Sequence, residues 1–335
     1  MRFHFFAIPA LCAAAAVSKT CENAPKRVEW RQMDESARKQ YINAVRCLTT
    51  KPSRIGLDTT LYDDFPYIHS QLDHQIHSVA SFLPWHRYFV HVYESALKEC
   101  GYEGVMPYWN WTLDAENVPK SAIWDAKTGF GGDGSPNRTE PTWGGRSFRK
   151  CVDDGPFKDF YPAYLSGDYD PHCLSRGWNN GSENVGDMLS KNYNKVAVDK
   201  VQKIDNYNNY RYDLEGGPHG AIHSAMGGDM GPNTSPNGKI IAPSTLHRSG
   251  DTADISDPIF FLHHAQIDRL WWFWQEESPK TRYTEFAGYK TQDQFDGTTP
   301  PPASLDDILL MNGLTEDLKV KDLMTSKSSL LCYSY

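Results

Sequence analysis

Six histidines of this 335-residue chain fall into two groups of three, one between residues 69 and 86 and one between residues 219 and 264. Neutral imidazole is a common ligand of transition metals, so each group supplies enough ligands for one ion. The second group contains a pair four residues apart, and in a helix both of its rings project from one face. The sequence therefore predicts two metal ions, held by His69, His77, His86, His219, His223 and His264.

The ligand types favour copper. No cysteine or carboxylate stands at ligand spacing in either group, whereas zinc sites often recruit a carboxylate, as in His-Glu-x-x-His. Here the segment from His219 to His223 has Gly-Ala-Ile between the histidines. An all-imidazole set adds no ligand charge and suits both Cu(I) and Cu(II), and three ligands leave a position open for oxygen or substrate. We expect two copper ions as the cofactor.

Other histidines compete for two of these positions. His74 also precedes His77 and is an alternative to His69, and His247 is an alternative third ligand in the second group. The remaining histidines His91 and His172 are expected to be ordinary core or surface residues.

Three predicted helices carry histidines on their early turns, and each has a proline in its first turn or just before it. The first runs through residues 86–100, the second contains residues 219–223, and the third extends to about residue 275. Gly101 and Gly227 are placed to end the first two helices. Rigid helices are suited to the precise geometry that a metal site requires. The three prolines are Pro84, Pro218 and Pro258, the last preceded by Asp257 as N-cap.

The rest of the chain is expected to support these helices. Asp34 is a favourable N-cap for a surface helix over residues 35–48, and residues 69–79 are also expected to be helical. Residues 118–184 and 227–257 are rich in Gly, Pro, Asn and Asp, which predicts long ordered loops. Asp268, one turn after His264, is expected to pair with a buried arginine such as Arg31.

Composition and targeting signals place the protein outside the cell. The apolar run that follows Met1-Arg2 is typical of a secretory signal peptide, which we assign to residues 1–18. Residues 21–335 then form a single catalytic domain, and no later segment is apolar enough to span a membrane. The net charge of −8 argues against nucleic-acid binding. A monomer or a homodimer is expected.

Six cysteines remain after the signal peptide, and an even number in a secreted chain indicates three disulfides. The sequence leaves fifteen pairings possible. Our working set joins Cys21 to Cys332, Cys47 to Cys100 and Cys151 to Cys173. Glycosylation sequons at Asn137, Asn180 and Asn233 have polar surroundings that suit exposed loops, whereas Asn110 is expected to be buried.

Two motifs resemble the tyrosinase and catechol oxidase family of binuclear copper enzymes, particularly its short secreted fungal members. They are FLPWHR at residues 82–87 and DPIFFLHHAQIDRLWW at residues 257–272, and the resemblance covers residues 27–335. It implies a mainly α-helical fold with a central four-helix bundle, long loops and few short strands. In the family the second histidine of the His-His pair is the ligand, so His263 becomes a neighbour. The implied ligands are His69, His77 and His86 for one copper and His219, His223 and His264 for the other.

The resemblance also implies roles for three non-ligand residues. Glu215 matches a glutamate near a bridging solvent that helps to accept the phenolic proton, and Phe260 matches an aromatic residue beneath the copper pair. Gly220 stands where members that hydroxylate monophenols efficiently often have asparagine. The implied activity is therefore oxidation of o-diphenols to o-quinones with O2, with weak monophenol hydroxylation, on small phenolic substrates.

The sequence is also compatible with other functions. The chain could be a tyrosinase with full monophenolase activity or an o-aminophenol oxidase. Outside this class, it could be an oxygen carrier of the hemocyanin type or a zinc hydrolase, or its histidines could be structural.

Overall fold

The structure is a computed structural model that describes residues 21–142, 148–179, 188–231, 255–292 and 297–335. The expected signal peptide, the sequons at Asn180 and Asn233, and the alternative ligand His247 lie outside these ranges. Within them, no helix has the length and apolar character needed to cross a membrane.

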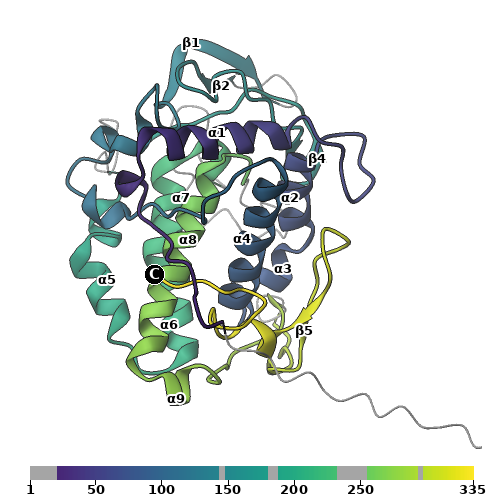
Figure 1. Cartoon of the computed structure of the whole chain (residues 1–335), viewed down its shortest axis with the longest axis vertical. Helices are drawn as coiled ribbons and strands as arrows, with labels where there is room; N and C mark the ends of the chain where they lie inside the picture. The colour runs from purple at the N-terminus through teal and green to yellow at the C-terminus, as the bar shows by residue number, and fades with distance from the viewer. Residues whose placement is uncertain (1–20, 143–147, 180–187, 232–254, 293–296) are drawn as a thin grey trace, which may run out of the picture.

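The centre of the molecule is helical. Helices α2 (Leu61–Gln71), α4 (Phe82–Glu99), α7 (Gly220–Met226) and α8 (Ile259–Glu277) lie together there, and α4 packs along α8 (Figure 1). The helix α1 (Glu35–Leu48) runs across one end of this group (Figure 1). The prediction of a mainly α-helical fold with a central helical bundle is confirmed.

Aromatic side chains hold the central helices together. The ring of Phe261 on α8 lies 5.6 Å from that of Phe65 on α2 and 5.7 Å from that of Phe89 on α4, measured between centroids. It also stacks on Tyr93. All four side chains are buried, and full burial of a large apolar side chain contributes roughly 1.5–3 kcal/mol. This cluster fixes the three helices that carry most of the first histidine group and His264.

The observed helix ends agree with the prolines and glycines in the sequence. The helix α4 begins at Phe82, which leaves Pro84 in its first turn, and Gly101 ends it with a φ of +83°. Gly227 ends α7 with a φ of +58°. The N-cap of α8 is Pro258 rather than the expected Asp257, although the Asp257 carboxylate still accepts a hydrogen bond from the backbone N–H of Ile259 at 3.2 Å.

The segment from residue 69 to 79 is less regular than predicted. The helix α2 ends at Gln71, a single turn forms α3 (Asp73–Ile76), and His77 follows with extended backbone, φ −119° and ψ 148°. The expected helix over 35–48 is confirmed as α1, where Asp34 accepts a hydrogen bond from the N–H of Ala37 at 2.8 Å. The other α-helices among the described residues are α5 (Lys195–Gln202), α6 (Tyr207–Leu214) and α9 (Pro279–Arg282).

In the part of the chain that the structure describes, three short antiparallel strand pairs lie outside the bundle. The longest joins β1 (Gly134–Pro141) to β2 (Phe148–Val152), with Gly134 opposite Val152. This hairpin falls in a region expected to be loop. The other two pairs join β3 (Tyr164–Leu165) to β4 (Asp168–Tyr169) and β5 (Ile308–Leu309) to β6 (Leu318–Lys319).

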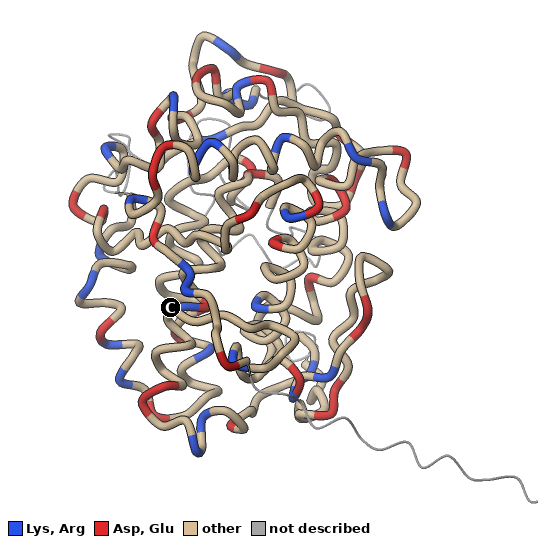
Figure 2. Tube along the Cα trace, viewed as in Figure 1, with Lys and Arg blue, Asp and Glu red and all other residues tan. Residues whose placement is uncertain are grey.

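The three disulfides join the cysteines as expected, at Cα separations of 5.4 to 5.9 Å. Charged residues of both signs are interspersed along the described chain (Figure 2).

The prediction that Asp268 pairs with Arg31 was wrong. Its carboxylate accepts from Arg87 at 2.5 Å and from Arg27 at 3.3 Å, and both arginines are buried. Arg87 reaches it because α4 packs on α8. The residue Arg31 instead pairs with Glu29 and Asp114.

Candidate metal centre

The first histidine group comes together from three elements. His69 lies on α2, His77 follows α3, and His86 lies on α4. One ring nitrogen from each lies within 4.8 Å of those of the other two. The Nε2 atoms of His69 and His86 are 3.3 Å apart. His74, the alternative to His69, is exposed and lies outside this group.

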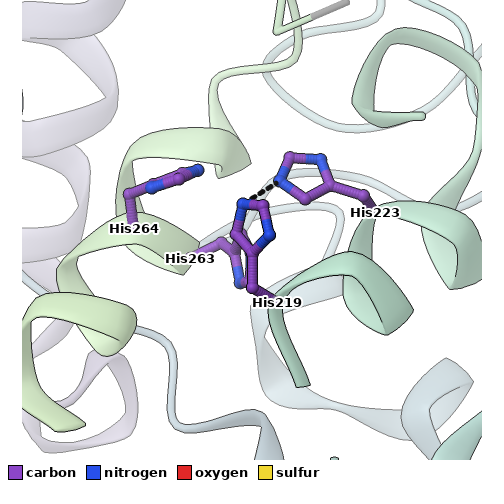
Figure 3. Close-up of side chains that lie close together, drawn as sticks. All are labelled: His219, His223, His263 and His264. Carbon is purple, nitrogen blue, oxygen red and sulfur yellow. Dashed lines mark hydrogen bonds between the residues drawn. The ribbon is translucent and has the colours of Figure 1, made fainter. Parts of the chain in front are cut away.

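The second group is built on α7 and α8. His219 ends a wide π-type turn (Glu215–His219) directly before α7, His223 lies in α7, and His264 projects from α8 toward them (Figure 3). The Nε2 atoms of His219 and His223 are 3.1 Å apart. The nitrogens of these three residues and of His263 all lie within 4.8 Å of one another.

The two groups are in direct contact. The rings of His86 and His264 stack at 4.4 Å with an interplanar angle of 15°. Phe260 lies against both groups, with its ring 5.3 Å from that of His69 and 4.1 Å from that of His264. Two ions held by these groups would therefore be neighbours, and Phe260 lies buried against both groups.

Hydrogen bonds at Nδ1 orient four of the six rings. A backbone carbonyl or carboxylate at Nδ1 requires a proton there, which leaves the Nε2 lone pair free for a metal. The acceptors are Asp73 Oδ1 for His77 (2.8 Å), Phe82 O for His86 (2.8 Å), Glu215 O for His219 (3.0 Å) and Met230 O for His223 (2.5 Å).

The ring nitrogens fit bound metal ions better than a closed polar network. Among the described residues, Nδ1 of His69, Nε2 of His263 and both nitrogens of His264 are buried without a hydrogen-bond partner. Buried polar atoms normally have a hydrogen-bond partner, so these unpartnered nitrogens need an explanation. The close Nε2–Nε2 pairs also bring lone pairs together, which a shared cation would stabilise. The donor set therefore suits one ion in each group.

Burial also keeps most of these imidazoles neutral. It lowers the pKa of His69, His86, His219 and His264 well below the usual value, and neighbouring imidazoles lower it further. Burial lowers the pKa of His223 to about 4. For His77, burial lowers the pKa but the hydrogen bond and charge of Asp73 outweigh it and raise the value.

Glu215 makes hydrogen bonds on the side of both histidine groups. Its carboxylate accepts from the backbone N–H of Ser78 at 2.5 Å, next to His77, and from Arg211 Nη1 at 3.1 Å. Its carbonyl accepts from His219. Burial raises the pKa of this carboxyl, against the lowering effect of His77, Ser78 and Arg211.

Gly220 begins α7 with ordinary helical backbone, φ −61° and ψ −31°. A Cβ atom at this position would meet only the carbonyl oxygen of Glu215, at 3.3 Å. A Cβ atom at residue 220 therefore requires this carbonyl to shift by a few tenths of an ångström.

Three residues near the site were not predicted from the sequence in these roles. Asp73 hydrogen-bonds His77, Arg211 pairs with Glu215, and Trp111 donates to His263 at 3.2 Å. The first two lie four residues before their partners, a helical spacing that could have indicated them. Of the other histidines, His91 is half-buried and His172 is buried against Asp229.

The fold and the site define a class of mainly helical proteins with two contacting imidazole groups on a central bundle. The model of the common central domain of tyrosinase matches residues 59–277, and the chain belongs to the tyrosinase family. It is thus a tyrosinase-family oxidoreductase, as the sequence motifs indicated.

Similar proteins extend this match over most of the chain. The tyrosinase-like protein phomQ1' of Diaporthe leptostromiformis is 40% identical over 327 residues, covering 94% of this chain and 80% of that protein. The tyrosinase ustQ of Aspergillus flavus is 37% identical over 316 residues, covering 94% and 80%. A mutant polyphenol oxidase from Thermothelomyces thermophila superposes with a TM-score of 0.73 at 27% identity, covering 93% of this chain and 88% of that one.

Proposed function

We propose that the protein is a secreted binuclear copper oxidase that converts o-diphenols to o-quinones with O2 and hydroxylates monophenols weakly. The ligands are His69, His77 and His86 for one copper and His219, His223 and His264 for the other. When bound, the copper pair would supply the redox chemistry through which O2 accepts electrons from a phenol. Each diphenol loses two electrons and two protons, so two diphenols reduce one O2 to two waters.

The residues around the ligands divide the remaining tasks. Glu215 accepts the phenolic proton, a role supported by its carboxylate being held beside His77 and one turn before His219. Phe260 supports the rings of His69 and His264 from below. Five of the six ligand histidines are buried and His77 is partly exposed, so the protein shields most of the ligand set from bulk solvent.

The glycine at residue 220 is the observation that carries the choice of substrate. An asparagine amide at this position, directly after His219, would be placed to orient a water that takes the proton of a monophenol. Glycine has no such group. A diphenol is more acidic and binds through two oxygens, so its oxidation depends less on this assistance.

The variant Gly220→Asn tests this assignment, and an added Cβ atom there would lie 3.3 Å from the carbonyl oxygen of Glu215. We expect the ratio of monophenol to diphenol turnover to rise about tenfold, which corresponds to roughly 1.4 kcal/mol. Gly220→Ala is the matched control, because it adds a Cβ without an amide. Oxygen uptake is measured on catechol, a monophenol and an o-aminophenol. Fast, lag-free monophenol turnover by the wild-type protein contradicts the proposal and favours a full tyrosinase.

The same measurements separate the other functions. Preferred turnover of the o-aminophenol identifies an aminophenol oxidase. Reversible O2 binding without turnover identifies an oxygen carrier, and bound zinc with no dependence on O2 identifies a hydrolase.

Secretion is part of the proposal. Three disulfides are typical of proteins that fold in an oxidising compartment, and the sequon residue Asn137 is exposed. We assign residues 1–18 to a signal peptide and residues 21–335 to one catalytic domain.

A further inference from the structure

We propose that the indole of Trp111 keeps His263 from binding the second metal by holding its proton on Nε2. This inference rests on the proposed function, since it concerns which imidazoles bind copper. It explains how a chain with two adjacent histidines assigns only one of them as a ligand.

Distance alone does not select His264 over His263. The rings of His263 and His223 are 4.9 Å apart, and those of His263 and His219 are 5.3 Å apart and nearly parallel. The three imidazoles of the second group and that of His263 all offer a nitrogen within the same 4.8 Å (Figure 3). A fourth buried imidazole therefore lies within reach of the site.

The hydrogen bond from Trp111 distinguishes the two histidines. An indole N–H can only donate, and Trp111 Nε1 lies 3.2 Å from His263 Nδ1. The Nδ1 atom must therefore supply a lone pair to the indole, and the neutral ring carries its proton on Nε2. Neither nitrogen of His263 then has a free lone pair for a metal.

His264 differs from His263 at Nδ1. Both rings have an unpartnered Nε2 in the described part of the chain, but the Nδ1 atom of His264 also lacks the hydrogen bond that Trp111 donates to His263. The tautomer of His264 is therefore not constrained, and a lone pair is available at whichever nitrogen faces the ion.

The backbone around Trp111 is attached to α8 on both sides of His263. The N–H of Trp109 donates to the carbonyl of Leu262 at 3.1 Å, and Gln266 Nε2 donates to Asn110 Oδ1 at 3.1 Å. Both Trp111 and His263 are fully buried. The indole is thus held in place beside His263, and no water competes for the hydrogen bond between Trp111 Nε1 and His263 Nδ1.

Nitrogen NMR of the Cu(I)-loaded protein, which is diamagnetic, tests the tautomer directly. The protein is labelled with ¹⁵N in the histidine rings, and the His263 signals are assigned by their loss in His263→Ala. We expect a neutral ring with the proton on Nε2. A proton on Nδ1, or a copper-bound nitrogen, overturns the inference.

Copper content after gel filtration tests the consequence. We expect His263→Ala to retain about two coppers per chain and His264→Ala about one, because His263 cannot replace the missing ligand. In the double variant Trp111→Phe/His264→Ala, His263 is released and the count returns to about two. Trp30→Phe/His264→Ala is the matched control and stays at about one, since the buried indole N–H of Trp30 has no hydrogen-bond partner among the described residues.

Two results contradict the inference: two coppers in His264→Ala, or no recovery in the Trp111 double variant with an unchanged circular dichroism spectrum. If Trp111→Phe does not fold, the NMR measurement decides alone. Failure of the proposed function is distinguishable, because the wild-type protein would then bind fewer than two coppers or oxidise no phenol.

Discussion

At the residue scale, each candidate ligand depends on what its other ring nitrogen contacts. His77 is held by the Asp73 carboxylate, whereas His86, His219 and His223 are held by backbone carbonyls. Such contacts fix the tautomer and the direction of the ligand lone pair. Because Asp73 accepts through its side chain, its contact with His77 can be removed by substitution without altering the main chain.

The variant Asp73→Ala is therefore expected to weaken copper binding at the first group by about 10–100-fold. The second group, whose hydrogen-bond acceptors are unchanged, should keep its affinity. Competition with a copper chelator measures both. Asp199→Asn, in an exposed pair with Lys195, is the control. Equal weakening of both sites, or of neither, would contradict the orienting role of Asp73.

Some of these residues could be predicted from the sequence and others could not. The ligand histidines could be selected because His86 and His264 stand in specific motifs and His219 and His223 have helical spacing. His69 and His77 were chosen because the spacing of the first group resembles that of the family. The contact between Trp111 and His263 joins residues 152 positions apart, and no local pattern encodes such a pair. The partner of Asp268 was mistaken for the same reason, since Arg87 meets it only when α4 and α8 pack.

At the element scale, helix ends determine where the ligands are placed. Proline in the first turn of α4 and glycine after it could be recognised because each fulfils a local backbone requirement. The break between α2 and α3 could not, because the helical pattern continues through it and only the ligand position of His77 requires the extended backbone. The β1–β2 hairpin was also missed, as its residues are mostly polar turn formers.

The substitution Gly101→Ala tests the local argument for α4. The residue has a φ of +83°, and a Cβ atom there would meet no atom within 4 Å, so the cost is conformational alone. We expect a loss of about 1 kcal/mol in the free energy of unfolding, measured with urea. Gly101→Asn should lose less, because asparagine tolerates this conformation. Equal stability of the alanine variant and the wild-type protein would be incompatible with this account.

At the scale of the whole molecule, a buried ionic cluster joins both ends of the chain to the central helices. The carboxylate of Asp268 on α8 accepts from Arg87, Arg27, Tyr333 and Tyr335. Burial raises its pKa, but the charges of Arg87 and Arg27 and the tyrosine hydroxyls outweigh this and lower it. Removing one member of such a cluster leaves the others buried without compensation.

The variant Asp268→Asn is thus expected to lose about 3–5 kcal/mol of stability at neutral pH. Because the folded-state pKa lies below the unfolded value of about 3.9, this contribution is fully present above that pH. It is lost as the pH falls through the folded pKa, so the difference between wild type and variant should shrink below about pH 4. Denaturant unfolding at several pH values measures it. A difference independent of pH would show that the charge of Asp268 does not matter.

Activity measured as a function of bound copper shows whether two neighbouring copper ions act together. The metal-free protein is loaded with increasing copper, and copper per chain and oxygen uptake with catechol are measured on each sample. We predict that full activity requires about two coppers per chain, with one O2 consumed for two catechols. Full activity at about one copper per chain, or no oxygen uptake at two, would contradict the account.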